Sequence, residues 1–398
     1  MMGRQVIERT MQQMLNGSRR IPPRCRHFGL CGGCYMQDVP YEDQVRAKGA
    51  LVAELACRAE GLEQTQIMPA IAMDDPWQYR NKAEMTFGSS ADGVILGFAP
   101  RGRFYEVVEI TECPISSDRT LAVARAAQDF ARKHALSAYD SRTHEGLLRH
   151  LVVRESRNTG DLLVNLVAAS PEWPREEFAA AMQPFRPSGV IWTLNTQLSQ
   201  AVKFDGIEVL IGTEKMRESA LDVTFTFSPQ CFFQTNTTMA ATLFQTAVQA
   251  AAANASRRVL DAYCGVGTLG ILLATQAAGV VGVEAVEPAV EDARFNAERN
   301  GVENAEFICG KVEKYDWEPG RFEIALVDPP RAGCHAKFIN RLVEKGPAKI
   351  VYISCNPLTM AADLARLQER YRAEWVQPID MFPHTVHVES VALLKAKQ

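Results

Sequence analysis

The sequence predicts a protein of mixed α/β and α+β class, in which a Rossmann-like sheet at the C-terminus follows a central domain built on an antiparallel sheet. Three observations indicate this fold. The chain has 398 residues, more than a usual single domain. Short strands separated by turn residues dominate residues 77–227, which is typical of an antiparallel sheet. Beyond them, strands alternate with helices of the length that crossover connections require.

Composition places the chain among soluble globular proteins, because 47% of its residues are hydrophobic and 23% are charged. No apolar run reaches the roughly 18 residues that a membrane span needs. The N-terminus lacks the apolar core of a signal peptide. We therefore expect a cytoplasmic protein that does not bind membrane, and free thiols rather than disulfides at its 10 cysteines. The net charge of −4 neither indicates nor excludes nucleic acid as a partner.

The part before residue 227 divides into a tail and the central domain. Residues 1–24 are expected to form a basic tail, which fits contacts with phosphate groups but is explained more simply as a solvated tail. The central domain, residues 25–226, begins with a helix at 37–60 that is expected to pack on the C-terminal domain. Alternating hydrophobic residues and turn signals predict strands at 83–89, 94–98, 104–110, 150–155, 161–168 and 189–195. One further helix is predicted at 118–134.

The C-terminal domain, residues 227–398, has the pattern of a doubly wound sheet. Its expected strands lie at 258–263, 280–284, 306–308, 323–327 and 349–354, and a final pair at 374–380 and 388–395 closes the chain. Ligands of such sheets bind at the carboxyl ends of the strands. Candidate site residues are therefore expected directly after these strands.

A nucleotide-like cofactor site is expected after the first of these strands. Gly265 and Gly267 permit a tight turn and close approach of a ligand to the backbone. Glu284 ends the next strand, where a carboxylate can accept both hydroxyls of a ribose. The pattern is G-x-G rather than the longer motif of pyrophosphate binders, which favours S-adenosylmethionine. The alternative is a glycine turn with a surface glutamate.

Candidate site residues also follow two further strands. Asp328 follows the fourth strand in Asp-Pro-Pro-Arg331, where it is placed for ligand contact or forms a plain turn. Cys355 follows the fifth strand and precedes Asn356 and Pro357, a good N-cap and a good first helical residue. The helix dipole there favours a nucleophilic thiolate, whereas a buried cysteine is more often a small hydrophobe.

A cluster of cysteines opens the central domain. Cys25, Cys31 and Cys34 lie close together in the sequence, and Cys113, which precedes a proline, is the best candidate for a fourth ligand. Iron–sulfur clusters and zinc both use such sets, and spacing alone does not separate them. His384 and His387 are expected to make hydrogen bonds or RNA contacts rather than bind a metal.

Together these motifs resemble the bacterial RNA uracil-C5 methyltransferases that carry a [4Fe–4S] cluster and modify 23S rRNA. Besides the segments quoted above, the resemblance includes Phe233-Gln234-Thr235-Asn236 and the segment from Phe382 to Glu389. The resemblance implies an iron–sulfur cluster at Cys25, Cys31, Cys34 and Cys113. It also implies that the residues in contact with S-adenosylmethionine are Gln234, Tyr263, Glu284 and Asp328.

The resemblance further implies a monomer that methylates a uridine of 23S rRNA through a covalent adduct. Cys355 is the implied nucleophile at C6 and Glu389 the base that removes the C5 proton. Many members of the family have an N-terminal RNA-binding barrel of the TRAM type, for which the 24 residues before Cys25 are too few. RNA capture is therefore expected to rely on the central domain. A tRNA T-loop uridine is the alternative target, and an iron–sulfur redox enzyme or a non-catalytic RNA-binding protein is less favoured.

Overall fold

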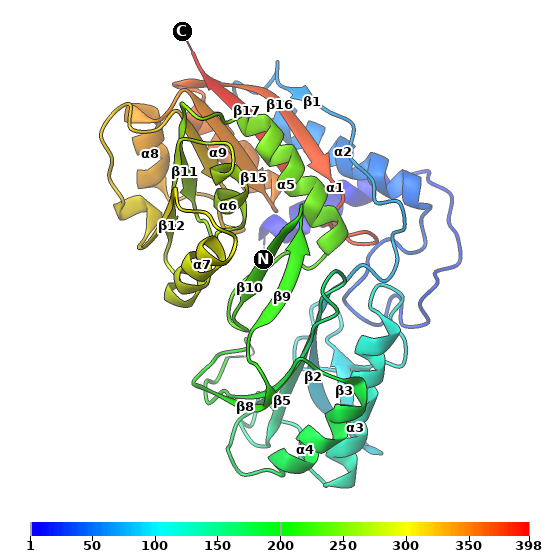
Figure 1. Cartoon of the computed structure of the whole chain (residues 1–398). Helices are drawn as coiled ribbons and strands as arrows, with labels where there is room; N and C mark the ends of the chain where they lie inside the picture. The colour runs from blue at the N-terminus through cyan, green and yellow to red at the C-terminus, as the bar shows by residue number, and fades with distance from the viewer. Residues whose placement is uncertain (1, 200, 398) are drawn as a thin grey trace.

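The computed structural model describes residues 2–199 and 201–397, and it divides into an upper and a lower body (Figure 1). The upper body is built on one large sheet and the lower body on another. A ribbon of two antiparallel strands, β9 (Met216–Ala220) and β10 (Val223–Phe227), lies between them. The chain passes from the lower to the upper body close to residue 227, where the pattern of the sequence changes.

The large sheet of the upper body is the predicted doubly wound sheet. Its strands lie in the order β1-β16-β17-β15-β14-β11-β12-β13, and β17 runs antiparallel to both of its neighbours. The bounds are β1 (Gln66–Ile67), β11 (Arg258–Ala262), β12 (Gly279–Glu284), β13 (Ala305–Cys309), β14 (Ile324–Val327), β15 (Lys349–Ser354), β16 (Tyr371–Ile379) and β17 (Glu389–Ala396). All five predicted crossover strands and the closing pair are confirmed within a few residues.

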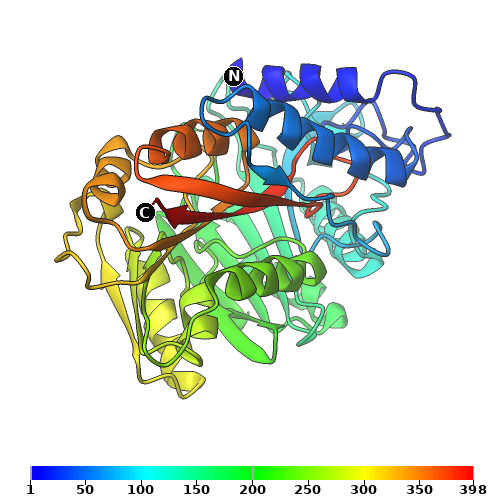
Figure 2. The same ribbon diagram turned by 90° about the horizontal axis from the view of Figure 1, so that it is seen from above.

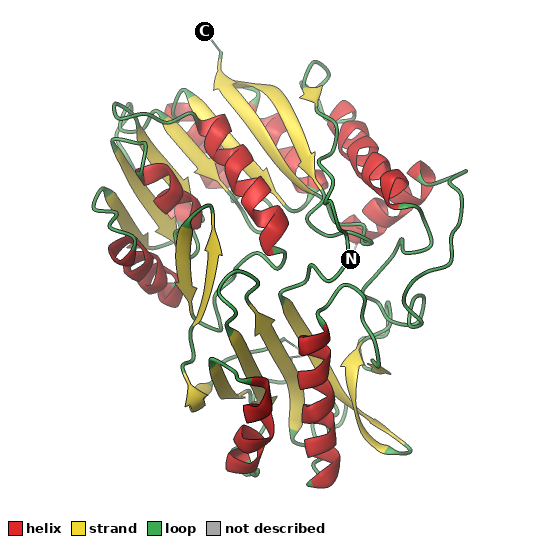
Figure 3. Ribbon diagram, turned by 45° about the vertical axis from the view of Figure 1, so that its right-hand side comes forward, coloured by secondary structure: helices red, strands yellow, loops and turns green. Residues whose placement is uncertain are grey.

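Helices cover both faces of this sheet (Figure 3). Alternate residues along each strand point to opposite faces, so Val351 joins one apolar core and Tyr352 the other. The first core is completed by α5 (Thr237–Ala251), α6 (Thr268–Ala274) and α7 (Glu287–Arg299), and the second by α1 (Met2–Met14), α2 (Tyr41–Cys57), α8 (Ala336–Lys345) and α9 (Pro357–Leu367). The site residues at the strand ends therefore stand on a sheet that is buried on both faces.

The N-terminal segment differs from the solvated tail that we predicted. Its first half is helix α1, and Ile7, Met11 and Leu15 are buried in the core that α2 shares with the large sheet. Figure 2 shows α1 and α2 side by side next to β16 and β17. An apolar residue every three to four positions gives this basic segment a face that packs.

The predicted helix at 37–60 is confirmed as α2, with a start four residues later.

The sheet of the lower body has the order β4-β3-β2-β5-β6-β7-β8. Its strands are β2 (Lys82–Ser90), β3 (Gly93–Phe98), β4 (Val108–Glu109), β5 (Leu148–Glu155), β6 (Leu162–Ala168), β7 (Gly189–Leu194) and β8 (Gly206–Gly212). Helices α3 (Asp118–Lys133) and α4 (Arg175–Met182) pack on one face. The pair β6–β7 is parallel, so the expectation of a purely antiparallel sheet is wrong there. The unpredicted helix α4 supplies the crossover that a parallel pair requires.

The predicted strand at 104–110 is largely absent, because only Val108 and Glu109 pair. Phe104 and Tyr105 are exposed and lie in turns, although their aromatic side chains favour strands. Among the described residues, no helix is both long and apolar enough to cross a lipid bilayer.

Candidate functional site

The turn after β11 has the backbone geometry that a ligand site needs. Tyr263, Gly265 and Gly267 all have positive φ angles, of 64°, 54° and 81°. A Cβ on Gly267 would lie 2.9 Å from the Phe307 ring, so only glycine fits there. Gly265 instead faces open space, with no atom within 4 Å of the position of a Cβ. This turn therefore leaves room for a ligand against the backbone of Gly265.

Glu284 lies beside this turn, as the sequence predicts. Its Oε2 accepts a hydrogen bond from Gly265 N at 3.2 Å. Its Oε1 accepts from the backbone N–H groups of Ala285 and Val286 at 2.7 and 2.9 Å. These bonds fix the carboxylate at the end of β12, next to the open space at Gly265. The geometry suits the binding of ribose hydroxyls.

Gln234 lies between strand β10 and helix α5, in the segment that links the two bodies. Asn81 anchors its backbone, because Asn81 Nδ2 donates to Gln234 O at 3.0 Å and Asn81 N donates to Thr235 O at 2.9 Å. Within the described part of the chain, the buried Gln234 Oε1 has no hydrogen-bond partner. A buried amide oxygen without a partner is costly. Gln234 and Glu284 thus offer polar atoms that fit the polar groups of S-adenosylmethionine.

Cys355 and Glu389 meet at the carboxyl edge of the sheet. Ser354 pairs with Ser390 in antiparallel β15 and β17, so Cys355 follows β15 opposite Glu389 at the start of β17. Asp328 follows the adjacent parallel strand β14 at the same edge. The buried Glu389 lies near enough to the half-buried Cys355 for its charge to raise the pKa of the thiol. The structure therefore brings three of the predicted site residues together.

All three acidic groups at this edge resist ionisation. Burial, then the charges of Glu389 and Asp328, raise the pKa of Cys355 to about 12, although Arg331 opposes them. Burial and the charge of Asp328 raise the pKa of Glu389 to about 8, and burial raises that of Asp328 to about 7. The expectation that the helix start favours the Cys355 thiolate is wrong for the site without ligand. A helix dipole contributes roughly 0.3–1 kcal/mol, which burial beside two carboxylates outweighs.

The helix start itself is as predicted. Asn356 caps α9 by accepting from Leu358 N at 3.2 Å, and its Nδ2 donates to Arg331 O at 2.9 Å. Arg331 Nη2 lies 2.6 Å from His387 Nδ1. The loop after Asp328 is thereby joined both to the Cys355 turn and to the loop that precedes Glu389.

The four predicted cysteine ligands converge although Cys113 is far from the others in sequence. Cys25, Cys31, Cys34 and Cys113 line one cavity of about 270 Å³. Three of the sulfurs accept hydrogen bonds, from Gly33 N to Cys31, from Gln37 Nε2 to Cys34 and from Ser116 Oγ to Cys113. Burial raises the pKa of Cys34 to about 12, and the other three thiols add to the effect.

The four cysteine sulfurs are the kind of ligands that bind a metal centre as thiolates. Their arrangement is not a compact single-ion site, because the described residues contain no group of three or more His, Cys, Asp or Glu side chains arranged to hold a metal ion. For His384 and His387 we expected RNA contacts or hydrogen bonds. His384 makes such bonds with its backbone N and O.

A cleft between the two bodies was not predicted. It has a volume of about 340 Å³ and is lined by Lys82, Arg154, Asn165 and Phe232, among others. Arg154 Nη2 donates to Cys231 O at 3.0 Å, and burial lowers the Arg154 pKa to about 10. The sequence signal was Arg154, which directly follows the apolar residues 151–153 of strand β5. Burying a cation is costly, so its position there indicates a specific role.

The two adjacent phenylalanines have different environments. Phe233 is buried and stacks on Phe227 with ring centroids 4.7 Å apart. Phe232 is 69% exposed and lies at the cleft. Phe233 therefore belongs to the apolar core. Phe232 is left available to stack on a base.

Comparison with known proteins identifies similar chains. Residues 208–397 match the family model described as tRNA (Uracil-5-)-methyltransferase. An uncharacterized RNA methyltransferase of Halalkalibacterium halodurans is 35% identical over 388 residues, which are 95% of this chain and 84% of the relative. One of Caldanaerobacter subterraneus subsp. tengcongensis is 38% identical over 381 residues, which are 93% and 84% of the two chains.

A solved structure extends the similarity to the fold. It is Pyrococcus abyssi tRNA (uracil-54, C5)-methyltransferase in complex with S-adenosyl-L-homocysteine, with 31% sequence identity and a TM-score of 0.76. The match covers 92% of this chain and 86% of that one. The mixed α/β architecture with a Rossmann-like domain is therefore a methyltransferase fold.

Proposed function

Because this chain belongs to the RNA uracil-5-methyltransferase family, we propose that it methylates C5 of a specific uridine in 23S rRNA, with S-adenosylmethionine as the methyl donor. The observation that carries the proposal is the position of Cys355 opposite Glu389, beside Asp328, at the edge of the sheet where the cofactor turn lies. A nucleophile, a base and a cofactor cradle are the parts that this reaction requires.

S-adenosylmethionine supplies an electrophilic methyl group when it is bound. The pKa of Cys355 falls when a positive charge lies beside Asp328, and the thiol proton then leaves to solvent. Cys355 Sγ bonds to C6 of uracil, and the electron pair of the C5–C6 double bond moves toward C5 and O4. C5 bonds to the methyl carbon as the S–CH3 bond of the donor breaks, its electron pair stays on sulfur in S-adenosylhomocysteine, and C5 still carries its hydrogen.

Glu389 completes the reaction by removing that hydrogen as a proton. The electron pair of the C5–H bond restores the C5–C6 double bond, and the bond from C6 to Cys355 Sγ breaks. Glu389 acts in its ionised form, which is the minor form at pH 7 because its pKa is raised to about 8, and the ionised carboxylate is a stronger base than that of an exposed glutamate. The proton then passes from Glu389 to solvent, which restores the starting state.

RNA is held, in this proposal, along the cleft between the two bodies. A uridine must be unstacked before its C5 and C6 atoms can enter the site. The exposed Phe232 lines the cleft, two residues before Gln234. An aromatic side chain there can stack on a base that has left the RNA stack. Lys82 lines the same cleft, where its Nζ pairs with Glu84 at 2.9 Å.

We further propose that the four cysteines hold a [4Fe–4S] cluster. The cavity that they line and the hydrogen bonds to three of the sulfurs support a group larger than one ion. A zinc ion would need all four sulfurs about 2.3 Å from one point. The cluster is proposed to hold structure and not to transfer electrons, because the reaction moves no net electrons.

The P. abyssi structure makes tRNA a second candidate substrate, because that protein acts on uracil 54 of tRNA and is 31% identical to this chain. Methylation assays with 23S rRNA and tRNA transcripts test the choice. Mapping of 5-methyluridine by mass spectrometry in RNA from a deletion strain is the decisive measurement. Loss of a 23S rRNA modification alone supports the proposal, and loss of the tRNA modification alone contradicts its target.

A further inference from the structure

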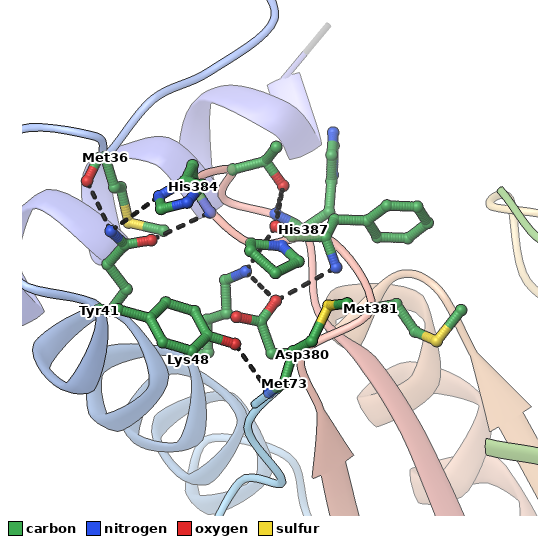
Figure 4. Close-up of polar contacts among 12 residues, drawn as sticks. Met36, Tyr41, Lys48, Met73, Asp380, Met381, His384 and His387 are labelled. Atoms are coloured by element: carbon green, nitrogen blue, oxygen red, sulfur yellow. Dashed lines mark hydrogen bonds and ion pairs between the residues drawn. The ribbon is translucent and has the colours of Figure 1, made fainter. Parts of the chain in front are cut away.

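The loop between β16 and β17, residues 380–388, leads directly into Glu389 and is held by helix α2 (Figure 4). Lys48 Nζ and Asp380 Oδ1 are 2.5 Å apart, and both side chains are 0% exposed. Lys48 Nζ also donates to Phe382 O at 2.9 Å, and Asp380 Oδ1 accepts from Phe382 N at 3.2 Å. The Lys48–Asp380 pair therefore holds the first turn of the loop through the side chain of Asp380 and through the backbone N and O of Phe382.

Gln44, one turn before Lys48 on α2, ties the middle of the loop to the segment after the N-terminal cysteines. Its Nε2 donates to Met36 O and Val39 O at 2.8 Å, and its Oε1 accepts from His384 N at 3.0 Å. Tyr35 N and Met36 N donate to His384 O at 2.7 and 3.0 Å. Both backbone polar groups of His384 are thus held by residues from the start of the chain.

His384 has a left-handed backbone, with φ of 66°, which residues with side chains adopt only at a cost. Its ring stacks on Trp77 at 4.0 Å between centroids, and Tyr79 Oη donates to Pro383 O at 3.0 Å. Burial and the nearby Lys48 lower the pKa of His384 to about 4, so the ring is neutral at pH 7. The surrounding contacts therefore hold the loop in one strained conformation.

The end of the loop determines where the proposed base lies. Ile379, the residue before Asp380, pairs with Glu389 across the hairpin. Thr385 Oγ1 accepts from His387 N at 3.2 Å, and His387 contacts Arg331. A shift of the loop would therefore move both Glu389 and the cation that opposes the raised pKa of Cys355.

The buried Lys48–Asp380 ion pair is better explained by the position that it gives the loop 380–388 than by a gain in the stability of the fold. Replacing a buried ion pair with apolar side chains of similar volume is often neutral or stabilising. Burial alone lowers the pKa of Lys48, against the attraction of Asp380. An apolar pair would attach α2 to the sheet as well, but it would not hold Phe382 O and Phe382 N.

We infer that Lys48, Gln44 and Asp380 are positioning residues for Glu389, which they hold in place for proton removal through the loop 380–388. The inference rests on the proposed function and deepens it, because it names residues that act at one step of the reaction. It predicts that losing these contacts slows the last step, after the methyl group has been transferred.

The test uses the full-length protein with Lys48→Met/Asp380→Asn, which removes both charges and leaves no unpaired ion in the core, and with Gln44→Leu. Turnover should fall by roughly 10- to 100-fold, as for a misplaced catalytic group, while the KM for S-adenosylmethionine stays within about twofold of wild type, since these residues do not contact the cofactor turn. A covalent protein–RNA adduct should accumulate on a denaturing gel. Release of tritium from RNA with 5-³H-uridine should slow in parallel.

The matched control is Lys215→Met, which breaks a 2.8 Å ion pair with the buried Asp292 elsewhere in the molecule. It should lower stability without adduct accumulation. The inference is overturned if Glu389→Gln traps an adduct and the Lys48→Met/Asp380→Asn variant does not, or if both Lys48→Met/Asp380→Asn and Gln44→Leu turn over at the wild-type rate. If Glu389→Gln itself traps no adduct, the assignment of the base is wrong and the inference falls with it.

Discussion

Cys355 and Glu389 stand opposite each other at the edge of the large sheet because Ser354 pairs with Ser390 between antiparallel β15 and β17. The two side chains reach the site from opposite strand directions, one at the end of a strand and the other at the start. Each has a raised pKa, in part because of the charge on a neighbouring acidic group. In the proposed reaction, this juxtaposition would let Cys355 bond to C6 of a uracil ring while Glu389 reaches the hydrogen on C5.

Replacement of the proposed nucleophile should abolish methylation. Cys355→Ala removes the sulfur that activates C5, so we expect no transfer of labelled methyl groups to RNA, with S-adenosylmethionine binding retained in calorimetry. Cys309→Ala, at an exposed cysteine, is the control and should keep wild-type activity. Methylation by the Cys355→Ala protein at the wild-type rate would refute the covalent mechanism.

Replacement of the proposed base should trap the intermediate. In Glu389→Gln the C5 proton cannot be removed, so a methylated protein–RNA adduct should persist on a denaturing gel. Glu374→Gln, at a glutamate on β16 that pairs with Arg372 and Lys395, is the control and should form no lasting adduct. Absence of an adduct in Glu389→Gln would show that another group removes the proton.

The raised pKa of Glu389 should make stability depend on pH. The folded state holds this proton up to about pH 8, whereas an unfolded glutamate loses it near pH 4.5. The contribution of this proton to the free energy of unfolding is therefore complete below pH 4.5 and is lost as the pH rises toward about 8. Relative to wild type, Glu389→Gln should gain up to about 1.4 kcal/mol per pH unit across this window. Urea unfolding at several pH values measures it, and a difference that does not change with pH would contradict the raised pKa.

The exposed Phe232 should contribute to RNA binding and not to cofactor binding. Stacking on a base is worth about 1–3 kcal/mol, so Phe232→Ala should raise the KM for RNA at least about fivefold. Its affinity for S-adenosylmethionine should not change. Phe104→Ala, at a similarly exposed phenylalanine of the lower body, is the control. Equal effects of the two substitutions would indicate that the cleft does not hold RNA.

The four cysteines should bind iron and sulfide in equal amounts. Protein purified without oxygen should show the broad visible absorbance of an iron–sulfur centre, and Cys34→Ser or Cys113→Ser should lose it. Cys57→Ser, at an exposed cysteine of α2, is the control and should retain it. Metal analysis that finds zinc without sulfide would replace the cluster with a zinc site.

The sequence by itself determined the elements and the order of the site residues. Continuous apolar strands and intervening helices predict a doubly wound sheet, and in such a sheet the strand ends that carry Glu284, Asp328 and Cys355 must share one edge. The cap formed by Asn356 and Pro357 was predictable because it depends only on neighbours in the chain. Local patterns therefore located the predicted site before any contact was known.

Only the tertiary structure decided the properties that depend on distant neighbours. The ionisation of Cys355 was predicted with the wrong sign, because burial and the charges of Glu389 and Asp328 outweigh the local helix dipole. The Lys48–Asp380 pair, whose members are 332 residues apart, has no local signal in the sequence. Burial and charge pairing depend on which distant residues pack against a side chain in the folded protein. A single sequence does not specify those neighbours.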